Sequence, residues 1–232
     1  MQQLPKIKSS IQNVSSFQEL VSIPFEGTCN ALCWSRKLKG DFLEIVANYE
    51  FEGNMLEVSI NSLESLKLSE TGQLARTIIL QDYKALKSYG ADPVLNIIRS
   101  YEKDEMFPLF PTDVYSFHVD RSPIETDTFL CTYVGDASEL IPNEFAIQKI
   151  QIPELRQQLR EIHTGNDDDF EDFLIENFFD LHYQQTMEGK TISLGNGNLW
   201  RLATDNPTSK VLPCIHRAPQ ETNGQKRLLL IC

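Results

Sequence analysis

The second half of the chain is a succession of short segments with the composition of β-strands, and this feature limits the fold more than any other. The segments are rich in aromatic and β-branched residues, and Pro, Gly, Asn or Asp stands between them: DVYSFHVD, TDTFLCTYVG, AIQKIQI, GKTISLGNGNLWRLA, KVLPCIHRAP and QKRLLLIC. Many short strands joined by turns are typical of a sandwich or barrel. We therefore expect an α+β fold whose core, residues 106–232, is a double-stranded β-helix, the cupin-like jelly roll.

Residues 1–105 have a different pattern, which predicts mainly helix. The segments SFQELVSIPF and KGDFLEIVANYEFEG have apolar residues at i, i+3 and i+4 spacing. The segment DYKALKSYGADPVLNIIRSYEKDEM predicts two helices broken at Gly90, the second with Asp92 as its N-cap and Pro93 as its first residue. We expect one domain over 1–232, with this helical part packed on the barrel.

A helical insert, at about residues 155–187, interrupts the strands. It predicts two helices joined at Gly165, the second with an apolar stripe of Phe and Leu residues. The acids Asp167 to Asp169 suit the start of a helix, where negative charge is favourable. They lack the spacing of an EF-hand loop, so a solvated helix start is favoured over a cation site. His163 and His182 belong to this insert and are interpreted as surface or core histidines.

Composition and charge restrict the partners. The net charge is −12, which argues against nucleic acid and anionic membranes because phosphate binding needs clustered Lys and Arg. No window approaches 18 uninterrupted apolar residues, and the N-terminus lacks the apolar core of a signal peptide. The five cysteines, odd in number and irregular in spacing, indicate reduced thiols. These observations predict a cytoplasmic protein.

Three residues could bind one metal ion. His118 and Asp120 are two apart in a predicted strand, and strand alternation places such residues on the same face. His216 ends a later apolar, strand-like run. Two histidines and one carboxylate occupy one face of an iron(II) octahedron and leave the other positions open. The alternative is that His118 and Asp120 form a local hydrogen-bonded pair while His216 ends a strand.

Arg227 is the candidate for holding a carboxylate in the same pocket. It lies eleven residues after His216, beyond a turn marked by Pro219 and the pair Asn223-Gly224. Asn-Gly favours a tight hairpin. We expect Arg227 to lie across that hairpin from His216, where its guanidinium can reach into the barrel and bind a carboxylate through two parallel hydrogen bonds.

The motif FHVD, a later HR and an Arg at the head of the last strand resemble the iron(II)- and 2-oxoglutarate-dependent oxygenases. The resemblance implies that His118, Asp120 and His216 are iron ligands and that Arg227 binds the distal carboxylate of 2-oxoglutarate. The chain also resembles a bacterial family of uncharacterised proteins in CNALCWSRKL, FHVDR with LCTYVG, GNGNLWRL, IHRAP and KRLLLIC.

The chain departs from the oxygenase pattern at two places. Many of these oxygenases have Ser or Thr two residues after the Arg, where this chain has Leu229. We therefore expect the second carboxylate contact to come from Tyr133 or Thr132. The segment VGDASEL replaces a turn containing Pro-Gly in the bacterial family, and we expect it to border the pocket and alter the substrate.

The resemblance implies a hydroxylase-type dioxygenase with Fe(II), 2-oxoglutarate and dioxygen. It would oxidise an unactivated C–H bond of a small molecule, an amino acid, or a peptide- or carrier-bound substrate. The alternatives are a cupin-like metal-binding module and a non-oxidative metalloenzyme, in which the metal acts as a Lewis acid. They share the ligands, so Arg227 is the residue that favours a 2-oxo acid. Alternation places Arg121 and Arg217 on the opposite face, as structural residues.

Overall fold

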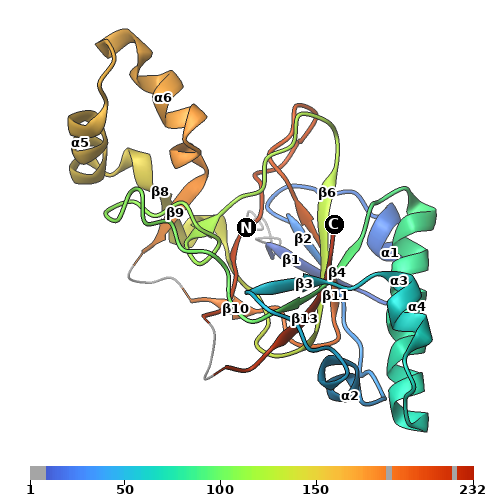
Figure 1. Cartoon of the computed structure of the whole chain (residues 1–232). Coiled ribbons are helices and arrows are strands. Elements are labelled where there is room, and N and C mark those ends of the chain that lie inside the picture. Colours follow the sequence, from blue (N-terminus) through green and yellow to red (C-terminus); the bar gives the residue numbers. More distant parts are fainter. Residues whose placement is uncertain (1–8, 187–189, 221–223) are drawn as a thin grey trace, which may run out of the picture.

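Two curled β-sheets form the centre of the molecule, and helices lie on either side of them (Figure 1). The computed structural model describes residues 9–186, 190–220 and 224–232. Within these residues one sheet has seven strands and the other has six. Every ladder between named strands there is antiparallel except that of β1 with β2. This mixed α/β arrangement is compatible with a β-sandwich or a jelly roll.

The larger sheet combines strands from both halves of the chain. In spatial order its strands are β1 (Ile11–Val14), β2 (Ala31–Trp34), β11 (Leu199–Ala203), β6 (Asp127–Val134), β13 (Arg227–Ile231), β4 (Val94–Ile98) and β3 (Met55–Glu57). Strand β6 lies at its centre, between β11 and β13. Its sequence DTFLCTYV is buried from its second residue on, as expected of a strand covered on both faces.

The smaller sheet contains only strands from the second half. In spatial order these are β10 (Ile192–Ser193), β7 (Glu139–Ile141), β12 (Ile215–Arg217), β5 (Phe117–His118), β9 (His182–Gln185) and β8 (Ala146–Gln148). Two of them, β12 and β5, are neighbours although about a hundred residues separate them in sequence. Each of the six strand-like segments predicted from the sequence contains at least one observed strand.

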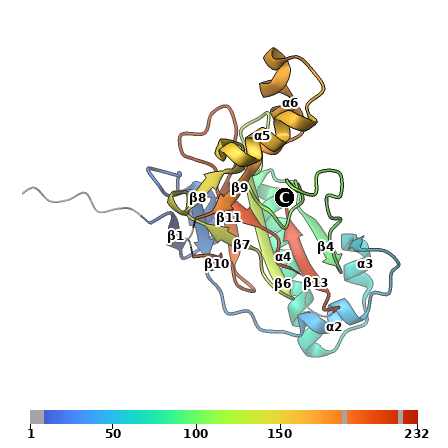
Figure 2. The same cartoon turned by 90° about the vertical axis from the view of Figure 1, so that its left-hand side faces the viewer.

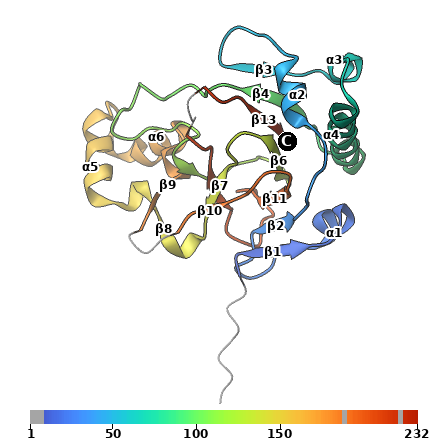
Figure 3. The same cartoon turned by 90° about the horizontal axis from the view of Figure 1, so that it is seen from below.

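The helices form two groups on opposite sides of the sheets (Figure 3). The first group is α1 (Phe17–Ser22), α2 (Phe42–Ala47), α3 (Ile60–Ser65) and α4 (Glu70–Tyr89); the second is α5 (Pro153–Ile162) and α6 (Phe170–Glu176). Helix α4 begins where the Ser69 hydroxyl accepts from the amide of Gly72, and it ends at Gly90, whose φ of 104° suits glycine. Its buried face includes Ala75, Ile79 and Leu86.

Strand alternation divides the apolar residues between two cores. On β13, Leu228 and Leu230 pack with α4 and the other N-terminal helices. Leu229 packs with Leu140 of the smaller sheet in a second core. Successive side chains of a strand point to opposite faces, so one strand serves both cores. The side chains between the two sheets are therefore those that can reach a site there.

The prediction for residues 1–105 was wrong in one element. No second helix follows Gly90: residues 94–98 form strand β4, which pairs with β3 and β13. The sequence VLNII is short and β-branched, and tertiary pairing outweighs the helix start that Asp92 and Pro93 suggest. Together, β1 to β4 make the first 105 residues part of the larger sheet as well as the source of its covering helices.

The predicted hairpin between His216 and Arg227 was also wrong. Strand β12 pairs with β5 and β7 in the smaller sheet, whereas β13 pairs with β4 and β6 in the larger one. The chain therefore crosses from one sheet to the other between these residues. Of the predicted turn, Asn223 lies outside the described residues.

The insert extends away from the sheets (Figure 2). Besides α5 and α6, it contains short 3-10 helices at Asp167–Asp169 (η3) and Phe179–Leu181 (η4); two more, Asn143–Phe145 (η1) and Lys149–Gln151 (η2), precede it. An aromatic cluster that includes Phe110, Phe170 and Phe179 holds it together. The predicted insert ran too far, because His182–Gln185 is strand β9. None of the described helices is long and apolar enough to cross a membrane.

Candidate metal centre

Two neighbouring strands of the smaller sheet place His118 and His216 side by side. They are register partners in β5 and β12, so their side chains project from the same face of the sheet. Asp120 lies just beyond β5, and its carbonyl accepts from the amide of Asp205 at 2.8 Å. This bond fixes the backbone that carries the carboxylate.

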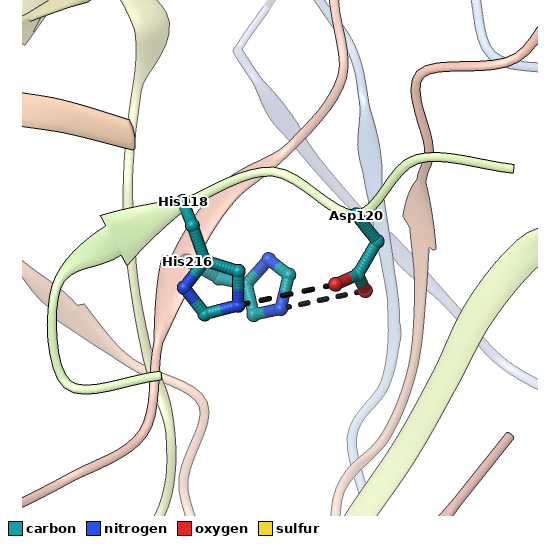
Figure 4. Close-up of side chains that lie close together, drawn as sticks. All are labelled: His118, Asp120 and His216. Carbon is teal, nitrogen blue, oxygen red and sulfur yellow. Dashed lines mark ion pairs between the residues drawn. The ribbon is translucent and has the colours of Figure 1, made fainter. Parts of the chain in front are cut away.

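The three predicted ligands converge (Figure 4). The Nε2 atom of His118 lies 3.9 Å from Oδ1 of Asp120, and that of His216 lies 3.6 Å from Oδ2. One ligand atom from each residue lies within 4.8 Å of the others, the only such group of three His, Cys, Asp or Glu residues among those described. Bonds near 2.1 Å place adjacent ligand atoms about 3 Å apart, so the side chains would draw together around an ion.

Backbone carbonyls orient both imidazoles. Nδ1 of His118 lies 2.8 Å from the carbonyl of Ser116, and Nδ1 of His216 lies 3.2 Å from that of Cys214. A carbonyl only accepts hydrogen bonds, so each Nδ1 carries a proton, and Nε2 of each ring is the nitrogen that faces Asp120. Metal-binding histidines are oriented in this way, by a hydrogen bond from the nitrogen that does not bind the ion.

The charges of the site suit a cation. Burial, and then the nearby His216, lower the pKa of His118 to about 4, so this imidazole is neutral at pH 7. Burial acts to raise the pKa of Asp120, but His216, the Thr128 hydroxyl and His118 outweigh it and the pKa is lowered. A neutral imidazole beside an ionised carboxylate is the protonation state in which both bind a metal.

The cluster opens into a cavity between the sheets. The cavity has a volume of about 140 Å³, well above the roughly 30 Å³ that one water occupies in the liquid. His118, Asp120 and His216 line it on one side. The larger sheet contributes Leu130, Arg227, Leu229 and Ile231, and two polar residues, Tyr101 and Ser138, complete the polar part of its wall.

Arg227 enters this cavity from the sheet opposite the ligands. It is 5% exposed, and its guanidinium donates to the hydroxyls of Thr132, Ser138 and Tyr101 at 3.0, 2.8 and 3.3 Å. Nε has no hydrogen-bond partner among the described residues, and no carboxylate there lies within ion-pair distance. Burial lowers the pKa of the guanidinium, against the opposing effects of Tyr101 and Asp136. Among the described residues the hydrogen-bond partners of this buried cation are hydroxyl groups, and such a cation is suited to an anionic ligand.

The predicted loop VGDASEL borders the cavity, as expected, and shapes the approach to Arg227. Gly135 has a φ of 84°, and a Cβ atom there would lie 3.0 Å from the Cα of Arg227. Glycine therefore allows the loop to pass close to the start of β13. Three residues further on, Ser138 supplies the hydroxyl that accepts from Arg227.

The two residues expected to assist Arg227 have different places. Thr132 faces the cavity side of β6 and accepts from the guanidinium. The prediction for Tyr133 was wrong: its ring stacks on Phe42 among the N-terminal helices, and its hydroxyl donates to Asp82 at 2.7 Å. Adjacent residues of one strand point to opposite faces, so only one of the two can reach the site.

Sequence reasoning missed His182, Ser138 and Tyr101. His182 of β9 is the register partner of His118 and completes a row of three imidazoles across the sheet. It is buried, and Nδ1 has no partner among the described residues. Ser138 was expected only as part of the loop that borders the pocket, and no motif surrounds His182 or Tyr101, so only the pairing of strands distant in sequence could have placed these two.

The arginines beside the ligands are structural, as alternation predicts. Arg217 pairs with Glu139 at 2.6 Å and lies over the ring of Phe117. Arg121 pairs with Asp205 and Asp180. Both guanidinium groups are thus already neutralised.

Comparison with known proteins does not assign a family or a function to this chain. No protein-family model, no curated protein and no solved structure matches this chain. The function must therefore be argued from the geometry of the centre.

Proposed function

We propose that the chain is an iron(II)- and 2-oxoglutarate-dependent oxygenase. The observation that carries the proposal is the shared cavity: two histidines and an aspartate line one side, and a buried arginine with no ion pair among the described residues lines another. The ligand set suits iron(II), and the arginine suits a carboxylate at a distance from the metal. A cosubstrate with a chelating end and a second carboxylate would use both features.

Each residue has a defined part in this proposal. His118 and His216 would hold iron through Nε2, and Asp120 would hold it through a carboxylate oxygen. Arg227 would bind the distal carboxylate of 2-oxoglutarate. The hydroxyls of Ser138 and Tyr101 lie beside it and would replace the Ser or Thr that many oxygenases have at the position of Leu229. Iron held there would supply the coupling of 2-oxoglutarate decarboxylation to oxidation of a substrate C–H bond by dioxygen. The chain itself orients these groups and keeps the cosubstrate in a sheltered cavity.

The fold proposed for this activity is a double-stranded β-helix. The metal ligands come from the smaller sheet and the carboxylate anchor from the larger one, with the cosubstrate between the two. The crossing of the chain between β12 and β13 supports this arrangement, because it brings an arginine and a ligand that are close in sequence to opposite walls of one cavity.

A second candidate is a metalloenzyme without redox chemistry. The ligand set itself favours it, since two histidines and one carboxylate also bind catalytic zinc. Such an enzyme has no evident use for Arg227, which costs free energy to bury without a counter-charge. The arginine therefore favours the oxygenase and provides the means to separate the two.

The test is an anaerobic titration of the metal-free protein with iron(II), with and without 2-oxoglutarate. A weak visible charge-transfer band that develops only with both supports the oxygenase. Arg227→Ala should weaken 2-oxoglutarate binding at least about a hundredfold, because removal of one partner of a buried ion pair costs roughly 3–5 kcal/mol. Arg227→Lys should fall between, since it retains charge but loses the fork.

The matched control is Arg217→Ala, which removes an arginine next to His216 that points away from the cavity. It should leave the titration unchanged. If Arg227→Ala binds 2-oxoglutarate as tightly as the parent, the anchor is misassigned. If zinc binds and no band forms with iron and 2-oxoglutarate, the second candidate replaces the first.

A further inference from the structure

We propose that an open groove beside Asp120 binds an extended peptide segment carrying lysine or arginine, and that this segment contains the substrate residue of the oxygenase. The groove is lined by Arg121, Ser122, Pro123, Phe178, Asp205, Asn206 and Pro207, and its volume is about 570 Å³. Its identity as a substrate site rests on the proposed function; its ability to bind a basic peptide does not.

The groove adjoins the metal centre through the backbone. Arg121 follows Asp120 in the chain, and the amide of Asp205 donates to the carbonyl of Asp120 at 2.8 Å. Asp120 is also the ligand most open to solvent: its side chain is 37% exposed, against 14% for His118 and 9% for His216. The groove therefore lies next to the ligand through which the centre is most exposed to solvent.

Phe178 forms an exposed aromatic wall of the groove, and its backbone is strained. It has a φ of 60° and is the one non-glycine residue with positive φ among those described. It follows the last residues of α6, a position where helices commonly have glycine. The residue is 59% exposed, although its neighbour Phe179 belongs to the buried aromatic cluster of the insert. Strained backbone of this kind concentrates at functional sites.

The charges around the groove favour a cation. The guanidinium of Arg121 is shared by Asp205 and Asp180, so two carboxylates face one arginine. The Asp205 side chain is 43% exposed and remains accessible. An exposed phenylalanine ring attracts ammonium and guanidinium groups, and Pro123 and Pro207 provide apolar walls for the methylene stem of a lysine or arginine. The net charge of −12 attracts the same ligands over a longer range.

The open shape of the groove favours a peptide over a free small molecule. Sites for small molecules enclose most of the ligand surface. Here the cavity of about 140 Å³ beside Arg227, which the cosubstrate would occupy, is the less open of the two, and the larger groove is open along the surface. An extended chain can lie along such a surface and extend one side chain toward the metal.

The test uses fluorescence anisotropy on the full chain without metal. The probes are two labelled nine-residue Gly/Ser peptides that differ only in carrying three arginines or three glutamates. We expect the arginine peptide alone to bind, more weakly as salt increases. Phe178→Gly should weaken it about two- to fivefold, the contribution of an exposed cation–π contact, without lowering the midpoint of thermal unfolding, because glycine relieves the strained φ.

Asp205→Asn should also weaken binding. The controls are Ile175→Ala, which alters an exposed apolar residue of α6 outside the groove, and Asp168→Asn, which removes an exposed acid elsewhere on the insert. Both should bind like the parent. Equal binding of the two peptides, no binding of either, or equal loss in the control variants overturns the proposal. Binding should persist in Arg227→Ala, so the peptide result and the 2-oxoglutarate result can fail independently.

Discussion

His118 and His216 are direct cross-strand partners, and each imidazole donates from Nδ1 to the carbonyl of the residue two positions before it. The repeated geometry has a simple origin. In both strands the ring folds back along its own backbone, so the orienting group is part of the same chain segment as the ligand. The two Nε2 atoms then face Asp120 without help from any other side chain.

The first prediction concerns these tautomers. In the metal-free protein, both rings should carry a proton on Nδ1, because only a donor can bond to a carbonyl. Long-range ¹H–¹⁵N correlation spectra of ¹⁵N-histidine-labelled protein distinguish the two tautomers. Assignment through His118→Gln and His216→Gln identifies the signals. A ring without a proton on Nδ1 would contradict the hydrogen bonds that orient the two imidazoles.

The second prediction concerns the ligands themselves. His118→Gln, Asp120→Asn and His216→Gln should each weaken iron(II) binding by more than the roughly 10- to 100-fold typical of losing an outer hydrogen-bond partner. Competition with a coloured chelator under anaerobic conditions measures the affinity. His163→Gln is the matched control, since this histidine packs on Phe173 in the insert, and it should bind iron like the parent. Equal loss in the control would point to a metal site elsewhere.

The third prediction compares two buried arginines. Arg36 is bidentate to Asp82, at 2.6 and 2.8 Å, so Arg36→Met leaves a buried carboxylate unpaired and should cost about 3–5 kcal/mol of unfolding free energy. Arg227 has no such partner among the described residues, and Arg227→Met should leave the stability of the ligand-free protein unchanged or raised. Urea unfolding measures both.

When metal and cosubstrate are present, Arg227→Met should instead have a lower unfolding free energy than the parent. Metal with 2-oxoglutarate at a hundred times its dissociation constant stabilises a binding-competent protein by about 2.7 kcal/mol. Arg227→Met should lose the part of this gain that depends on 2-oxoglutarate. A large destabilisation of ligand-free Arg227→Met would show instead that the guanidinium supports the fold.

The fourth prediction concerns pH. Burial, followed by the nearby His118 and Lys149, lowers the pKa of His182 to about 3, compared with 6.5 in an unfolded chain. Between these values the unfolded state binds the proton and the folded state does not, so stability is highest above pH 6.5 and falls as the pH decreases. His182 alone should cost about 3 kcal/mol between pH 7 and pH 4.

His118, whose pKa is lowered in the same direction, adds to this dependence. Urea unfolding of the metal-free protein at each pH should show the decline, and His182→Gln should reduce its slope by about one proton, or roughly 1.4 kcal/mol per pH unit. An unchanged slope would mean that His182 is accessible to protons in the folded protein.

Local sequence patterns predicted the strands well and their partners poorly. Strands were correctly predicted around His118, Thr132, His216 and Arg227. The signals for a strand, alternation and flanking turn residues, involve only a few neighbouring positions. The strand at residues 94–98 was not predicted, because Asp92 and Pro93 are typical of a helix start. VLNII forms a strand through its pairing with β3 and β13. The hairpin expected before Arg227 failed for the same reason: a turn signal does not reveal which sheet the next strand joins.

The sequence by itself determined which residues are candidate metal ligands and in what order they occur. His118 and Asp120 are two apart, His216 ends a later strand-like segment, and Arg227 follows it. The residue types and their order can therefore be read from the sequence alone. Only the tertiary structure decided that His118 and His216 are register partners, that Arg227 reaches the cavity from the opposite sheet, that Thr132 rather than Tyr133 contacts it, and that His182 lies in the same row. The physical reason is that side-chain direction follows from local alternation, whereas contact between strands distant in sequence depends on how the whole chain buries its apolar surface.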